Sequence, residues 1–301
     1  MIYINLGFPK TGTTNLQFNF YPYLKKIEYL GKSTLEKKSK LFYELNNFVE
    51  NRVEFSDLKL DNLINDFVEY YNMHKKILIS NENWLSPYQK NNLLKKTQIV
   101  PQETKLNNIK LFFKKCNIPY KFFLINRAPE QLIPSYFATM QNRINDLFGE
   151  NFLSFDFFLN YVDQKKDKYE NQLLLFHTFN IKKITKIISK EKLKIFEYSD
   201  ILYNKKKFIF DLSTYLEIPA DYNLIEKLKI KMRVTPKTND NSYKFYTPNI
   251  LLKILKFLIP KFLKKKVIFL LKINYVKFSL FKEIKINRVN NNLKKIIKEY
   301  Y

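Results

Sequence analysis

Apolar residues along this chain fall into two patterns, short continuous runs and longer stretches with a three- to four-residue period. Short runs are typical of buried strands, and the longer period is typical of amphipathic helices. Strands are predicted at residues 2–6, 76–80, 121–126 and 192–198. Helices are predicted from Thr13 onward, across 21–75 with Ser56 as an N-cap, from Ser86-Pro87 onward, and over 102–115, 129–145 and 208–216. Strands that alternate with helical segments predict an α/β fold, a three-layer sandwich with a central parallel sheet covered on both faces.

The loop between the first predicted strand and the helix after it has an unusual composition. Gly7 and Gly12 lie in this loop, although the whole chain of 301 residues has only four glycines. This placement predicts backbone conformations that side chains would obstruct. Unpaired amides and the helix dipole converge at such a junction, so the loop predicts a site for a phosphate-like anion. The motif differs from a Walker A loop, because Thr13 and Thr14 follow Gly12 and the cation, Lys10, precedes it.

The segment GFPKTGTTNLQ resembles the 5′-phosphosulfate loop of sulfotransferases that use 3′-phosphoadenylyl sulfate (PAPS), especially carbohydrate sulfotransferases. The resemblance spans about residues 1–241 and implies a P-loop-type fold, PAPS as donor and no metal. It implies that the donor is bound by Pro9, Lys10, Thr11, Gly12, Thr13 and Thr14. Two alternatives stay open from the residues alone: a tight turn that binds nothing, and a P-loop kinase, which would carry Lys after Gly12.

A second motif, NRAPEQLIPSY, begins where the strand at 121–126 ends. Arg127 emerges at the carboxyl edge of the sheet, and Ser135 follows two turns into the next helix, so the pair predicts a second phosphate site. In the sulfotransferase family, R-x-P followed by Ser at this spacing holds the 3′-phosphate of PAPS. The family usually has Tyr two residues after this Ser, where this chain has Phe137. The resemblance also implies nucleotide contacts from Arg233 and Lys237, for which a solvated basic loop is the alternative.

Sulfuryl transfer to a hydroxyl also needs a base that accepts the proton. Glu82 follows the strand at 76–80, and the family resemblance implies that Glu82 is this base and that Lys10 is the second catalytic residue. Trp84 is predicted to bind substrate by stacking on a sugar ring. The alternatives are an exposed capping role for Glu82 and simple packing for Trp84. His74 and His177 lie away from both motifs and are expected to be structural.

Composition adds a strong positive charge. Lys and Arg number 53 against 28 Asp and Glu, a net charge of +25, which indicates an anionic partner. An AT-rich genome would also enrich Lys, Asn, Ile, Phe and Tyr, so part of this charge has a mutational explanation. The single cysteine, Cys116, excludes an internal disulfide, and two histidines leave no zinc pattern. No zinc, RNP or helix-turn-helix pattern favours nucleic acid as the partner.

The remaining expectations concern location and domains. Met1 leads directly into the first strand, and no stretch approaches the ~20 apolar residues of a spanning helix, so a cytoplasmic bacterial enzyme is expected. Residues 248–281 interleave apolar residues with Lys, which predicts basic helices that lie on an anionic inner membrane face. Packing on the sheet is the alternative. We therefore predict an α/β sulfotransferase domain at 1–247, a basic helical extension at 248–301, and an oligosaccharide or glycolipid acceptor.

Overall fold

The computed structural model describes residues 1–8, 10–32, 40–52, 54–86, 88–90, 97–148, 155–164, 181–228, 242–248 and 281–287, together with 293, 294 and 297. Pro9, His177, Arg233 and Lys237 lie outside these residues, as does most of the predicted C-terminal extension. None of the helices in the described ranges combines the length and the apolar character needed to cross a bilayer.

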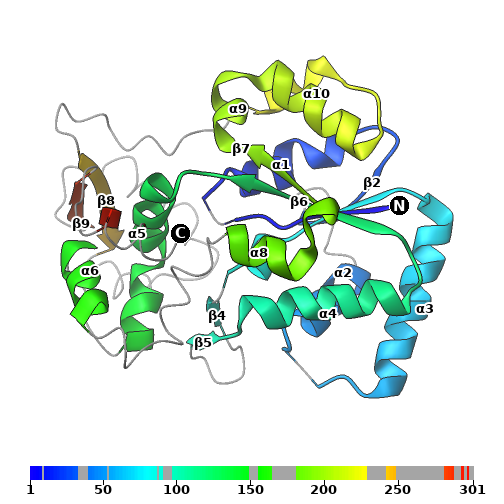
Figure 1. Cartoon of the computed structure of the whole chain (residues 1–301), viewed down its shortest axis with the longest axis horizontal. Helices are drawn as coiled ribbons and strands as arrows, with labels where there is room; N and C mark the ends of the chain where they lie inside the picture. Colours follow the sequence, from blue (N-terminus) through cyan, green and yellow to red (C-terminus); the bar gives the residue numbers. More distant parts are fainter. Residues whose placement is uncertain are drawn as a thin grey trace, which may run out of the picture.

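Five parallel strands form the central sheet, in the order β2-β3-β1-β6-β7 (Figure 1). β1 lies in the middle, where Ile4 is in register with Ile79 of β3 and with Phe122 of β6. The predicted α/β class with a central parallel sheet is confirmed. The strand bounds are β1 Ile2–Asn5, β2 Glu28–Gly31, β3 Ile77–Ser80, β6 Tyr120–Asn126 and β7 Leu193–Glu197.

Helices cover both faces of this sheet because successive side chains of each strand point to opposite sides. Ile2 and Ile4 pack into one core with α2, α3, α4 and α8, and Tyr3 packs into a second core with α1, α9 and α10. Figure 1 shows these two helical layers above and below the sheet. The helices of the two layers are α1 Thr13–Asn19, α2 Lys40–Val49, α3 Asp57–His74, α4 Gln102–Lys115, α8 Ile181–Ile188, α9 Tyr198–Tyr203 and α10 Lys205–Leu216.

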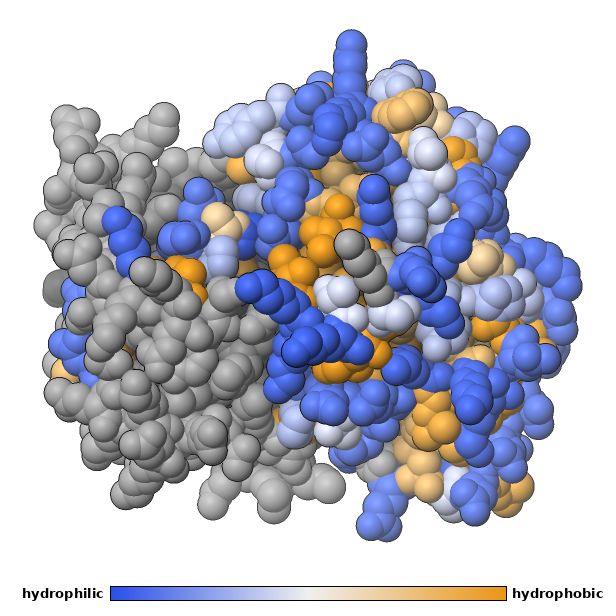
Figure 2. Space-filling view, in the orientation of Figure 1, coloured by the Kyte–Doolittle hydropathy of each residue, from blue (hydrophilic) through white to orange (hydrophobic). Residues whose placement is uncertain are grey.

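Beyond the sheet lie α5 (Pro129–Phe148), which follows β6, and α6 (Phe155–Gln164). Short 3₁₀ turns form at η1 (Tyr21–Tyr23), η2 (Glu82–Trp84), η3 (Lys190–Lys192) and η4 (Tyr222–Leu228). On the face drawn in Figure 2, the described surface is mainly hydrophilic, with small apolar areas between the polar side chains.

The topology places several loops at one edge of the sheet. From β1 the chain runs through α1 to β2 at one side of the sheet, whereas β6 pairs with β1 on the other side. Connections that diverge in this way leave a crevice at the carboxyl ends of the strands, the usual ligand position in open α/β sheets. The loop after β1, η2 after β3 and Arg127 after β6 all start from this edge.

Three segments differ from the predicted elements. β2 (Glu28–Gly31) lies inside the 21–75 stretch that was predicted to be helical. The sequence does not predict this strand because Glu and Gly are uncommon in strands, and β2 forms by pairing with β3. After Ser86 the chain forms β4 (Tyr88–Lys90) rather than a helix, and β4 pairs with β5 (Thr97–Ile99).

The third difference concerns the C-terminal extension. β8 (Ser242–Pro248) pairs antiparallel with β9 (Phe281–Asn287), and β9 lies beside α6 (Figure 1). The helical prediction is therefore wrong for 281–287, where Ile284 and Ile286 alternate with polar residues at the two-residue period of a strand. The predicted boundary at 247/248 falls within β8, and the division into two domains stays a prediction.

Candidate active site

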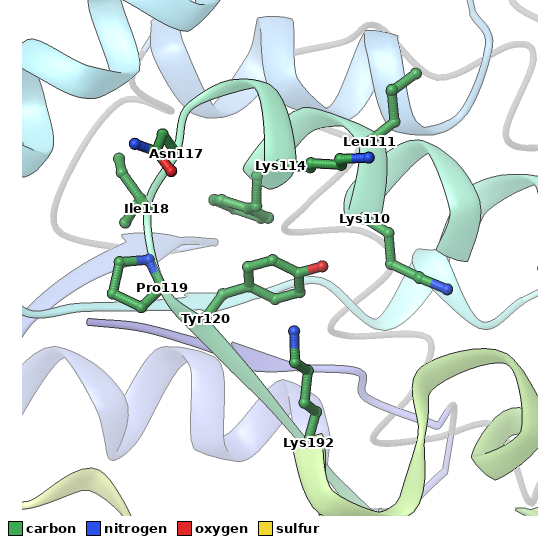
Figure 3. Close-up of a pocket in the computed structure, with 9 residues that line it drawn as sticks. Lys110, Leu111, Lys114, Asn117, Ile118, Pro119, Tyr120 and Lys192 are labelled. Atoms are coloured by element: carbon green, nitrogen blue, oxygen red, sulfur yellow. The ribbon is translucent and has the colours of Figure 1, made fainter.

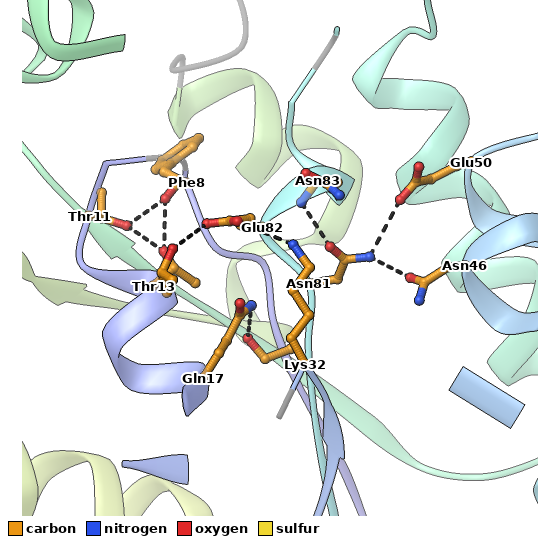
Figure 4. Close-up of polar contacts among 12 residues, drawn as sticks. Phe8, Thr11, Thr13, Gln17, Lys32, Asn46, Glu50, Asn81, Glu82 and Asn83 are labelled. Atoms are coloured by element: carbon orange, nitrogen blue, oxygen red, sulfur yellow. Dashed lines mark hydrogen bonds and ion pairs between the residues drawn. The ribbon is translucent and has the colours of Figure 1, made fainter. Parts of the chain in front are cut away.

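The loop after β1 folds back on itself through its threonines. The hydroxyl groups of Thr11 and Thr13, both buried, donate to the carbonyl oxygen of Phe8 at 2.7 and 2.9 Å (Figure 4). A Cβ on Gly7 would lie 2.3 Å from Cγ2 of Thr13, so this close approach requires glycine. These hydroxyls stabilise the loop itself, and what Thr13 offers a ligand is its backbone N–H.

The amino end of α1 has no side-chain cap. Its N-cap residue is Gly12, with φ 75° and ψ 7°, and no side-chain hydrogen bond caps this end of the helix within the described residues. Lys10 also adopts a left-handed conformation, with φ 70°. The first-turn amides at Thr13 and Thr14 have no partner within a helix, so a loop of this shape leaves donors for an anion.

A buried polar network lies beneath the loop and fixes it to the sheet. The amide of Asn5 donates to the hydroxyl of Tyr21 at 2.6 Å and to Oγ of Ser80 at 3.2 Å. Nε2 of Gln17 in α1 also donates to Oγ of Ser80, at 2.9 Å (Figure 4). Burial raises the pKa of Tyr21, which keeps its hydroxyl neutral. The network joins β1, α1 and β3 directly under the predicted anion site.

Arg127 joins the second motif to the first. Its Nη1 donates to the carbonyl oxygen of Lys10 at 2.9 Å, across 117 positions of sequence. Its guanidinium carbon lies 5.1 Å from the ring centroid of Tyr198, and its buried Nε has no hydrogen-bond partner in the part of the chain that the structure describes. Ser135 is half-buried in the second turn of α5, the helix that follows Arg127.

Glu82 lies beside the loop, as its place after β3 predicts. Its carboxylate accepts a hydrogen bond from Oγ1 of Thr14 at 3.2 Å and forms an ion pair with Nζ of Lys32 at 3.2 Å. The side chains of Glu82 and Lys32 are 24% and 23% exposed, so solvent and substrate can reach the pair. Figure 4 shows Glu82 between the loop and Lys32. Sequence reasoning missed Lys32 because its position depends on β2, and a Lys directly after a strand is the signal that could have found it.

Two aromatic residues near the motifs belong to the hydrophobic core. Trp84 is fully buried, and its indole N–H donates to Oδ1 of Asn46 at 2.9 Å, so neither face of the ring is open to a sugar. The substrate-binding prediction for Trp84 is corrected to a packing role. Phe137 is buried and stacks on Phe158, with ring centroids 4.9 Å apart. It contributes to the core around α5 and α6.

Two other ionisable residues, His74 and Glu197, have partners of their own. His74 ends α3, with Nδ1 3.8 Å from the carboxylate of Glu28, at the start of β2. Glu197 is exposed at the end of β7 and accepts hydrogen bonds from Asn126 at 3.2 Å. Within the described ranges, no group of three or more His, Cys, Asp or Glu is arranged to hold a metal ion.

A cavity of about 590 Å³ lies at the opposite edge of the sheet, where Pro119 leads into β6 (Figure 3). Its lining includes Lys110, Lys192 and Tyr120. Nζ of Lys192 lies 4.8 Å from the ring centroid of Tyr120, and Lys110 donates to the carbonyl of Ile187. None of the predicted site residues lines this cavity.

Comparison with known proteins gives structural similarity only. No protein-family model matches the chain, and no curated protein is similar to it. A sulfotransferase from Alicyclobacillus acidocaldarius has 13% identity and a TM-score of 0.42, over 73% of this chain and 82% of that one. The sulfotransferase domain of the Synechococcus PCC 7002 olefin synthase has 13% identity and a TM-score of 0.38, over 75% and 76%. The sulfotransferase domain from the curacin biosynthetic pathway has 15% identity and a TM-score of 0.37, over 75% and 77%.

All three are sulfotransferases or sulfotransferase domains. Their identities are low and their TM-scores are below 0.5, so the activity of this chain has to be argued from the residues of its own site.

Proposed function

We propose that this chain is a sulfotransferase that moves a sulfuryl group from PAPS to a hydroxyl or amine of a carbohydrate acceptor. The observation that carries the proposal is the hydrogen bond from Arg127 to the carbonyl of Lys10, 2.9 Å long. It brings together two motifs that each resemble a phosphate-binding segment of PAPS-dependent enzymes. Glu82 contacts the same loop through Thr14, which adds a carboxylate beside the two cationic residues.

The residues present fit a bisphosphorylated nucleotide. The amides of Gly12, Thr13 and Thr14 and the ammonium group of Lys10 would bind the 5′-phosphosulfate. The uncapped helix end supports this assignment. Arg127 and Ser135 would bind the 3′-phosphate, and the Nε of Arg127, which is buried and without a hydrogen-bond partner among the described residues, is a donor that such a group can use.

In the proposed reaction, the acceptor oxygen forms a bond to sulfur, and the bond between sulfur and the phosphate oxygen breaks. The acceptor proton passes to the carboxylate of Glu82, and adenosine 3′,5′-bisphosphate leaves. Negative charge grows on the leaving phosphate, where Lys10 and the loop amides act as fixed donors. Lys32 holds the carboxylate of Glu82 in position through its ion pair until the acceptor hydroxyl arrives.

The activity is tested by incubating the protein with PAPS and a panel of oligosaccharides and glycolipids, and following the acceptors by mass spectrometry. We expect at least one acceptor to gain the mass of a sulfuryl group, and Lys10→Ala to abolish the gain. Transfer of the γ-phosphate of ATP, with no consumption of PAPS, would instead assign the chain to the P-loop kinases.

Attachment to the inner face of the membrane is proposed from the Lys-rich residues 248–281 alone. We expect the full chain to sediment with vesicles of anionic lipid at low salt and to be released as salt rises, because surface charges are screened beyond about 8 Å at physiological ionic strength. Equal sedimentation with neutral vesicles, or none with either, would contradict this location.

A further inference from the structure

Lys105 is a buried ammonium group that the proposed reaction does not use. It lies in α4 with 1% of its surface exposed. Its Nζ donates to the carbonyl oxygens of Ser86 and Asn83, at 2.7 and 3.0 Å. Burying a charged side chain without a carboxylate directly bonded to it costs free energy. The presence of a lysine at this buried position is therefore not explained by a contribution to stability.

The two carbonyls belong to the turn that carries Glu82. Glu82 is the first residue of η2, and Asn83 and Ser86 follow it within one tight turn, in which the amide of Ser86 donates to the carbonyl of Asn83 at 3.2 Å. Lys105 thus attaches the residues that follow Glu82 in the chain to α4.

The other side of Glu82 is tied to α2. Nδ2 of Asn81 donates to Oδ1 of Asn46, and the same nitrogen lies 3.4 Å from Oε1 of Glu50 (Figure 4). Oδ1 of Asn81 accepts from the amide of Asn83 at 3.0 Å, so one residue joins both halves of the turn. The backbone of Glu82 is therefore held between two helices of the same layer.

We propose that Lys105 is a positioning residue, whose ammonium group clamps the turn that carries Glu82 to α4 and so keeps the carboxylate beside Thr14 of the loop. This role rests on the proposed function, because it matters for turnover only if Glu82 accepts the proton. The clamp itself is a structural claim and is tested separately.

Burial lowers the pKa of Lys105 to about 8, with nearby Glu50 raising it and Arg52 lowering it. The other ionisable groups that face the clamp are Glu82 in the turn and Tyr136 of α5, whose hydroxyl lies 3.0 Å from Oγ of Ser86. An ammonium group donates stronger hydrogen bonds than a neutral amine. Desolvation outweighs these hydrogen bonds, however, because the pKa of Lys105 is lowered in the closed turn and would return to about 10.4 if the turn opened to water. Opening of the turn should therefore become less favourable as the pH rises from about 8 to about 10.4.

Trp84 gives a direct readout, because it is the only tryptophan of the chain, it lies within the clamped turn, and it is fully buried. In Lys105→Met we expect a red-shifted Trp84 emission and increased quenching by acrylamide, while binding of adenosine 3′,5′-bisphosphate changes less than about twofold. Turnover should fall by about 10- to 100-fold at unchanged nucleotide affinity, the scale expected for a displaced catalytic group. Lys114→Met, an exposed position of the same helix, is the control and should match the wild type.

Wild-type protein provides the second measurement, which does not depend on whether Lys105→Met folds. Acrylamide quenching of Trp84 should fall as the pH rises from about 8 toward about 10.4, because the closed turn becomes more favourable over this range. Unchanged emission and quenching in a folded Lys105→Met, or wild-type quenching that is flat across this pH range, would overturn the clamp. A clear change of Trp84 in Lys105→Met without loss of turnover would overturn the positioning role of Lys105, while Glu82 itself is tested by Glu82→Gln.

Discussion

Replacing Glu82 with Gln removes the proposed base while preserving the shape of the site. The amide of Gln can accept from Lys32 through Oε1 and donate to Oγ1 of Thr14 through Nε2, so both contacts of the carboxylate have a substitute. Glu82 and Lys32 are each about a quarter exposed, and the loss of such an ion pair costs at most about 1 kcal/mol. The free energy of unfolding and the affinity for the nucleotide should therefore stay close to wild type.

Turnover should respond very differently. An amide cannot accept the proton of the acceptor, so kcat should fall by about 10²- to 10⁴-fold, the usual contribution of a general base. The assay follows release of adenosine 3′,5′-bisphosphate with a saturating acceptor. Glu197→Gln is the matched control: it makes the same change of charge at the same edge of the sheet, at the end of β7, and should retain full turnover.

Two results would refute this reasoning. Turnover of Glu82→Gln within a few-fold of wild type would exclude Glu82 as the base. An equal loss in Glu197→Gln would show that the charge of the edge, rather than one carboxylate, controls the rate.

The remaining predictions concern nucleotide binding, the loop and pH. Arg127→Ala should weaken binding of adenosine 3′,5′-bisphosphate about 10- to 100-fold in calorimetry, because a charge-assisted contact of ~1.5–3 kcal/mol is lost. An unchanged Kd, or an equal effect of the control Lys114→Ala, would contradict the second phosphate site. Gly7→Ala should lower the free energy of unfolding by about 1–3 kcal/mol because Thr13 must move away from the new methyl group, and a urea midpoint equal to wild type would be inconsistent with this close approach. Between a pH of about 8 and about 10.4, Lys105 keeps its proton in the unfolded chain and releases it in the folded chain. The free energy of unfolding of wild type, relative to that of Lys105→Met, should therefore rise with pH by up to about 3 kcal/mol. A difference in urea unfolding that stays constant across this pH range would rule this out.

The main elements of the fold could be predicted because their signals are local. The regular spacing of apolar residues in α4 predicts its bounds, and the short apolar runs predict β1, β3, β6 and β7. β2 could not be predicted in the same way, since Glu28–Gly31 has weak strand character and becomes a strand by pairing with β3. The antiparallel pair of β8 and β9 likewise depends on pairing between segments distant in sequence.

The residues of the candidate site likewise include some that the sequence predicts and some that only tertiary packing brings into place. The positions of the predicted strands and the spacing of the motifs were enough to predict that Arg127 and Glu82 would lie at the loop edge, because the carboxyl ends of parallel strands meet there. Lys105 could not be singled out among 53 Lys and Arg residues, and Lys32 could be recognised only with β2 in place before it. In sequence, Lys105 resembles any lysine of an amphipathic helix, and only the packing of α4 on the turn after β3 shows that it is buried.

The most direct test of the central claim is calorimetry of the wild-type chain with adenosine 3′,5′-bisphosphate in the absence of metal, compared with ATP in the presence of Mg²⁺. We expect saturable binding of the bisphosphate, because the loop amides with Lys10 and the guanidinium of Arg127 offer two separate phosphate sites joined at one edge of the sheet. Saturable binding of Mg-ATP, with no heat from the bisphosphate, would contradict it.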